Sequence, residues 1–141
     1  MRPQDVQSKL DIIPDNLEKL EIFRGMSYEE FTSDFRNIDS ALHRLQTSIQ
    51  AFIDIGAYVI ASLGLRTPST NAEVIDILVE RGLLSPDRRD RYISMIQFRN
   101  RIVHFYNGIN FRILYQIIQD ELVDIRELYR ILIRIIEEHP E

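Results

Sequence analysis

The sequence has no cysteine among its 141 residues, which excludes disulfides and thiolate metal sites. It also lacks any apolar run of about 18 residues, and it lacks a charged segment followed by a short apolar one. Those two patterns mark membrane spans and secretory signals. We therefore expect a cytoplasmic protein with no membrane partner.

Strand patterns, internal repeats and low-complexity tracts are absent as well, and only five glycines and five prolines interrupt the chain. A chain of this length can bury about two-thirds of its unfolded surface, which suits one core and leaves too little for a second full domain. We predict a single all-α domain over residues 1–141.

What the sequence does contain is apolar residues at spacings of three and four, the period of an amphipathic helix. They predict four main helices and a short one, at about residues 4–23, 28–65, 71–81, 86–106 and 110–137. In the last of these, the acidic residues of 119–124 are most simply a solvated face.

Local signals predict how the helices begin and where they are disturbed. Ser27 and Thr70 each precede a glutamate by three residues, which is the capping-box pattern of a helix start. Pro14 predicts a kink or a restart inside the first helix. From Phe31 to Leu63 the spacing runs without a break, so we predict one long continuous helix there.

The second half of this long helix is apolar nearly all round, and Asp54 is its only charge. Gly56 allows a neighbouring helix to approach closely. Either a crowded bundle or a second subunit would bury such a segment. Asp54 has two interpretations: a carboxylate that pairs with an arginine to hold the fold, or a group that supports a functional site.

Charge is unevenly distributed along the chain. The net charge is −5, but residues 81–112 contain seven arginines against two aspartates. Fifteen of the seventeen basic residues are arginine, whose forked guanidinium suits phosphate and carboxylate. A solvated helix face with ordinary ion pairs explains the same charge pattern equally well.

The chemistry is concentrated in Arg99, Asn100 and His104, near the end of the predicted helix 86–106. Asn100 and His104 share a helix face, so the amide oxygen could accept from the imidazole and orient it. Arg99 is five residues from His104, about 140° round the helix. The two cannot converge unless the helix end deforms or a second subunit completes a shared cleft.

Histidine as acid and base beside a phosphate-binding arginine suits metal-independent RNA cleavage, in which a ribose 2′-hydroxyl attacks the neighbouring phosphate. The alternative is structural: Arg99 pairs with a core carboxylate such as Asp54, and His104 is a satisfied buried histidine. No metal or cofactor is expected, because no ligand cluster, glycine-rich phosphate loop or Ser-His-Asp set stands out.

The pattern Arg99-Asn100-x-x-x-His104-x-Tyr106 resembles the Arg-x4-His-x-Tyr signature of the HepT-like toxins, a branch of the HEPN superfamily. Segments 51–55, 80–84 and 95–100 also look like that family. The resemblance implies an up-and-down helical bundle that dimerises so that two motifs face one cleft. It further implies ribonuclease activity resting on Arg99 and His104.

The resemblance also implies a partner, a minimal nucleotidyltransferase antitoxin of the MntA type that transfers AMP to Tyr106. Phosphate added near Arg99 would occupy the place of the RNA backbone. Two other readings stay open. One is a non-catalytic HEPN module that binds a nucleotidyltransferase or a nucleotide, and the other is a purely structural bundle.

Overall fold

The computed structural model describes residues 4–104 and 110–139, and for residues 102–104 it describes the backbone alone. The described residues form helices and no strand, as predicted. The elements are α1 (Gln4–Arg24), α2 (Tyr28–Thr32), α3 (Phe35–Ser62), α4 (Asn71–Glu80), the 3-10 helix η1 (Pro86–Arg88), α5 (Arg89–His104) and α6 (Phe111–Glu138). None of these helices is long and apolar enough to cross a membrane.

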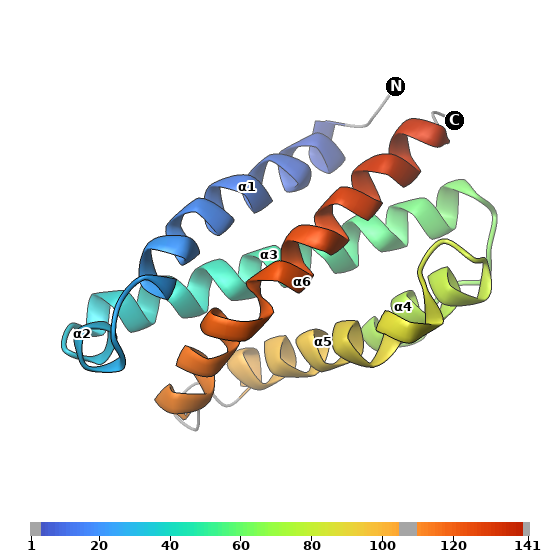
Figure 1. Ribbon diagram of the computed structural model, residues 1–141. Coiled ribbons are helices and arrows are strands. Elements are labelled where there is room, and N and C mark those ends of the chain that lie inside the picture. The colour runs from blue at the N-terminus through green and yellow to red at the C-terminus, as the bar shows by residue number, and fades with distance from the viewer. Residues whose placement is uncertain (1–3, 105–109, 140–141) are drawn as a thin grey trace.

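The long helices α1, α3, α5 and α6 alternate in direction, so that α1 begins and α6 ends at the same end of the bundle (Figure 1). Helix α3 is central: α1 and α6 pack against it, and so do α4 and α5. Helix α6 packs mainly on α1 and α3, whereas α5 packs mainly on α3 and α4. Helices α5 and α6 therefore both pack on α3, and they contact each other less than they contact α3.

The apolar stripes read from the sequence form one continuous core. Val6, Leu45 and Leu128 represent the stripes of α1, α3 and α6, and each is buried. Gly56 explains how α4 can lie against α3: a Cβ at this position would stand 2.6 Å from Val74 Cγ1. The close approach predicted at Gly56 is thus to a helix of the same chain.

The predicted continuous helix from Phe31 to Leu63 is wrong, because the chain breaks after Thr32 and restarts at Phe35. Asp34 is the N-cap of α3, and its carboxylate accepts a hydrogen bond from the Arg36 backbone N–H at 2.9 Å. Phe35, placed in the apolar stripe by its spacing, is 71% exposed. A local side chain to backbone bond outweighed the heptad pattern here.

The other predicted helix signals behave more nearly as expected. Ser27 and Glu30 form the complete capping box. Thr70 accepts from the Glu73 backbone N–H, but the Glu73 carboxylate binds Arg66 instead of reaching back, so only half of the second box forms. Pro14 lies within α1, which continues through it without the restart that we considered.

Candidate functional site

Helix α5 presents the candidate residues near its C-terminal end. Tyr92 and Ile96 occupy the predicted core stripe and are buried, and Arg99 follows them at the same register, half buried. The neighbouring stripe is more open: Gln97 is exposed and Asn100 is half buried. The buried face of α5 is therefore apolar as far as Ile96 and becomes polar at Arg99, near the C-terminal end of the helix.

Arg99 and Asn100 contact each other. The Arg99 Nη1 donates to the Asn100 Oδ1 at 3.3 Å. The Arg99 Nε is buried and has no hydrogen-bond partner among the residues that the structure describes. A buried donor without a partner is costly unless a ligand or another molecule uses it.

His104 is the last residue of α5, but its side chain lies outside the described part of the structure, as does the whole of Tyr106. The predicted contact between Asn100 and the imidazole, and the predicted modification of Tyr106, therefore rest on sequence. The Asn100 amide oxygen has a second lone pair that is not used by Arg99.

The structure gives Asp54 partners on α1 and α3. Its carboxylate lies 3.3 Å from the Lys9 Nζ of α1 and accepts a 2.8 Å bond from the Gln50 side chain. The predicted pairing of Asp54 with an arginine such as Arg99 is wrong, since its ion pair in the described residues is with a lysine. Asp54 joins α3 to α1, whereas α5 packs on α3 and α4.

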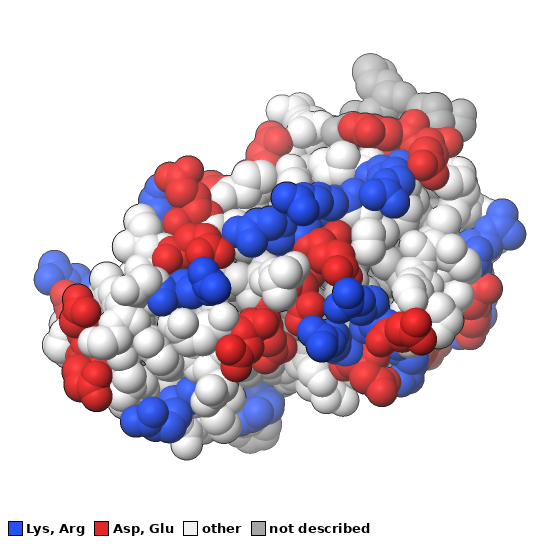
Figure 2. Space-filling view, viewed as in Figure 1, with Lys and Arg blue, Asp and Glu red and all other residues white. Residues whose placement is uncertain are grey.

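Ion pairs neutralise part of the arginine cluster in 81–112. Arg88 and Arg91 face carboxylates of α6, and Arg89 binds Asp76 of α4. The other four arginines of the segment, Arg81, Arg99, Arg101 and Arg112, have no ion pair in the described part of the chain. Acidic and basic side chains are interspersed over the face shown in Figure 2. Two of these four arginines, Arg99 and Arg101, lie in the last turns of α5.

The acidic middle of α6 is only partly a solvated face, which corrects the sequence prediction. Asp124 is 3% exposed, and the Arg91 Nη1 lies 3.2 Å from its Oδ1. One turn on, Glu127 accepts a 2.7 Å hydrogen bond from the Tyr92 hydroxyl. Burial, followed by this contact with Glu127, raises the pKa of the Tyr92 phenol. These bonds tie the start of α5 to α6.

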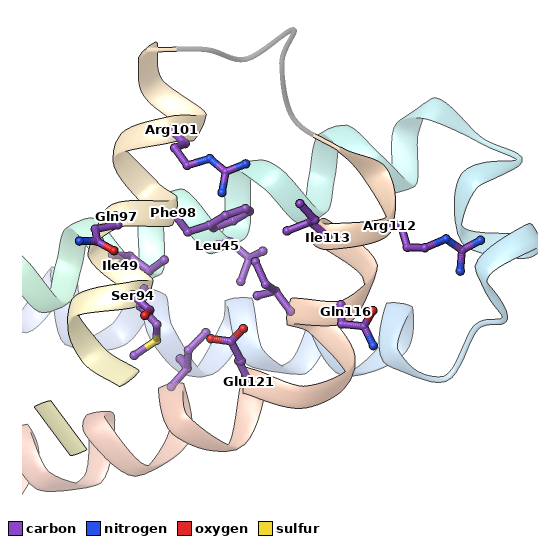
Figure 3. A pocket seen from close by; sticks show the side chains of 13 residues that line it. Leu45, Ile49, Ser94, Gln97, Phe98, Arg101, Arg112, Ile113, Gln116 and Glu121 are labelled. Atoms are coloured by element: carbon purple, nitrogen blue, oxygen red, sulfur yellow. The ribbon is translucent and has the colours of Figure 1, made fainter. Parts of the chain in front are cut away.

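Towards the C-terminal end of α5, the two helices leave a pocket of about 420 Å³ with α3 as its floor (Figure 3). Its apolar surface includes Leu45, Ile49 and Phe98, while Arg101 and Glu121 supply charges of opposite sign. Glu121 is half buried. Burial, reinforced by repulsion from Asp124, raises the pKa of the Glu121 carboxyl.

Sequence reasoning missed Glu121 as a pocket residue, although a signal was present. Glu121 is four residues after Ile117 and four before Ile125, so it shares their helix stripe. All three line the pocket. Within the described residues, no group of three or more His, Asp or Glu side chains could hold a metal ion.

Comparisons with known proteins identify the family of this chain. Residues 13–135 match the family model described as ribonuclease HepT-like. The chain belongs to this family. The resemblance to the HepT-like family and the prediction of a ribonuclease are thereby confirmed.

Two HepT-like relatives are informative. The chain is 26% identical over 103 residues to an mRNA nuclease HepT of Shewanella oneidensis, covering 73% of this chain and 77% of that protein. It is 27% identical over 110 residues to a tRNA nuclease HepT of Aphanizomenon flos-aquae, covering 78% and 75% respectively.

The HepT-like fold is also seen in a solved structure of a tri-AMPylated HEPN toxin from Shewanella oneidensis in complex with an MNT antitoxin. The TM-score is 0.83 at 22% identity, with 94% of this chain and 99% of that chain covered. At this identity the likeness establishes the fold, which is the predicted HEPN-type helical bundle.

Proposed function

We propose that this HepT-like protein is the toxin of a toxin–antitoxin pair and a metal-independent endoribonuclease. Arg99 binds the scissile phosphate, His104 acts as acid and base, and Asn100 orients the imidazole. The observation that carries the proposal is the buried Arg99 Nε, which has no partner among the described residues. Guanidinium donors suit phosphate oxygens, so RNA would supply the missing partner.

The reaction follows from these groups. The ribose O2′ forms a bond to phosphorus while the bond from phosphorus to O5′ breaks, which leaves a 2′,3′-cyclic phosphate and a 5′-hydroxyl. His104 accepts the 2′-hydroxyl proton as the base and, once protonated, donates a proton to O5′ as the acid. His104 ends α5, where the helix dipole favours the protonated form, and Arg99 stabilises the charge that builds on the phosphorane.

The proposed active form is a homodimer. Arg99 and His104 are five residues apart on one helix, about 140° round its axis, so one copy cannot direct both at the same atom. Two copies that face each other across a twofold axis would supply an arginine from one chain and a histidine from the other.

Regulation is proposed to follow the Shewanella relative, which is AMPylated and bound to an MNT antitoxin. Here an MntA-type nucleotidyltransferase would transfer AMP to the hydroxyl of Tyr106. The tyrosine oxygen forms a bond to the α-phosphorus of ATP as pyrophosphate leaves. Tyr106 is two residues beyond His104, so the adduct would place a phosphate beside the proposed catalytic groups.

The decisive experiment is RNA cleavage by the purified protein in the presence of a chelator. We expect Arg99→Ala and His104→Ala each to reduce the rate by about 100-fold or more. Arg36→Ala is the matched control, because Arg36 is an exposed arginine at the start of α3. Equal cleavage by all four proteins, or loss of cleavage with the chelator, would contradict the proposal.

The modification is tested separately with an MntA-type antitoxin and ATP. We expect the intact mass to rise by the mass of AMP groups and the ribonuclease rate to fall together. Tyr106→Phe should abolish both effects, whereas Tyr58→Phe, a change within α3, should leave them intact. A mass gain that persists in Tyr106→Phe would place the acceptor elsewhere.

A further inference from the structure

The pocket between α5 and α6 has polar groups at two ends and an apolar middle. Figure 3 shows Arg101 and Phe98 reaching from α5 towards α6, with Glu121 extending from α6 into the space below them. Its volume of about 420 Å³ lies in the range of small-molecule sites. Phe98 is 6% exposed and presents its ring between the two charged ends.

The two charged residues do not satisfy each other. Arg101 and Glu121 form no ion pair together, and neither forms one with another residue that the structure describes. Arg112, also at the rim, points away in Figure 3 and stacks over the Tyr28 ring at 3.9 Å. The pocket thus keeps one guanidinium and one carboxylate available, with a gap between them.

These groups specify the chemistry of an occupant. A carboxylate accepts hydrogen bonds, so the ligand must present N–H donors at the Glu121 end. A guanidinium at the other end favours a phosphate. The apolar middle favours a flat ring, because aromatic and apolar side chains stack on bases in single-stranded RNA.

We propose that this pocket is a guanine subsite for the RNA strand: Glu121 accepts from guanine N1–H and N2–H, and Arg101 contacts the adjoining phosphate. Guanine is chosen because its Watson–Crick edge offers two adjacent N–H donors, whereas adenine and cytosine offer one amino group and uracil one imide. The proposal rests on the proposed ribonuclease function and deepens it by naming a base preference.

The subsite and Arg99 lie on different sides of α5, so an RNA strand that meets both would cross the end of the helix. Arg101 is two residues further along α5, about 200° round the helix and about 3 Å along its axis. The guanine subsite would therefore hold a nucleotide near the scissile phosphate but not the scissile phosphate itself. Glu121 and Arg101 would determine specificity, while Arg99 and His104 would carry out the chemistry.

The test is equilibrium binding of the four ribonucleoside 5′-monophosphates to the purified, unmodified full-length protein. We expect GMP to bind about tenfold more tightly than AMP, CMP or UMP. Glu121→Gln should remove this preference, because the amide carries no charge and offers a single acceptor. Asp120→Asn is the matched control, since Asp120 neighbours Glu121 on α6 but faces a different hollow and should keep the preference.

The outcome is separable from the outcome of the cleavage assay. Arg99→Ala and His104→Ala should keep the GMP preference while losing RNA cleavage. Equal binding of all four nucleotides, absence of binding, or tighter binding of AMP than of GMP would overturn the guanine assignment. A Glu121→Gln change that alters the sedimentation coefficient without altering nucleotide binding would overturn it too, by assigning the pocket to contact between copies.

Discussion

At the scale of single residues, the polar side chains of this HepT-like protein differ in whether they have hydrogen-bond or ion-pair partners. Asp124 is buried but paired with arginine, and Asp54 is held by a lysine and a glutamine. The Arg99 Nε is buried without a hydrogen-bond partner, and the half-buried Glu121 has no ion pair in the described residues. Arg99 lies on α5 and Glu121 on α6, near the C-terminal end of α5 where the proposed chemistry would take place.

Glu121 should therefore reduce stability above acidic pH. Burial raises the pKa of its carboxyl in the folded state, so the folded protein binds this proton more tightly than the unfolded chain does. Stability then falls as pH rises from the unfolded pKa through the folded one and stays lower above it. Glu121→Gln removes this loss.

We expect urea denaturation to give a more stable Glu121→Gln variant at pH 7. The difference should shrink as pH falls through the raised pKa of the folded protein and be nearly absent below about 4.3, the pKa of an unperturbed glutamate. Asp120→Asn keeps Glu121 and removes only a minor cause of its raised pKa, so its stability should differ from the parent's much less over this pH range. A Glu121→Gln variant that is less stable than the parent at pH 7 would contradict the reasoning.

At the scale of elements, the sequence predicted the main helices well because their apolar stripes repeat over many turns. It failed where one short-range bond decided the outcome: the Asp34 cap interrupts a periodic pattern that the spacing of Phe35 continues. It also failed for Asp124, because the burial of this carboxylate depends on an arginine that the neighbouring helix α5 supplies. Such pairing depends on packing, which periodicity alone does not specify.

The contact of α3 with α4 gives an element-scale prediction. Gly56→Ala should destabilise the fold by about 1 to 2 kcal/mol, because overpacking against Val74 exceeds the helix gain of alanine over glycine. Val74 is β-branched and has little rotamer freedom with which to retreat. The measurement is the free energy of unfolding in urea.

Val74→Ala provides the control for this change. In that background the added Cβ has room, so Gly56→Ala should be neutral or stabilising, and the double-mutant cycle should give a clear coupling energy. The same cost in both backgrounds would show that Val74 is not the obstacle.

At the scale of the whole molecule, the pocket results from the way that α5 and α6 pack. Helices α5 and α6 each pack on α3 and are tied together at the start of α5 by Arg91 and Tyr92. Towards the C-terminal end of α5, the two helices leave the pocket between them and do not pack directly together. The motif residues remain a prediction from the sequence pattern. The pocket was not predicted, because its floor comes from α3, which is distant in sequence from α5 and α6.

The proposed dimer predicts that two inactive variants can restore each other's activity, which a site within a single chain would not allow. If each site combines Arg99 of one copy with His104 of the other, Arg99→Ala and His104→Ala variants are each inactive alone but complementary. Unfolding and refolding them as a mixture should produce heterodimers with one intact site and cleavage well above that of either variant. The measurement is the rate of RNA cleavage, with sedimentation to establish that dimers form. Heterodimers that remain inactive would show that Arg99 and His104 act within one chain, and would require the end of α5 to deform so that both reach the same phosphate.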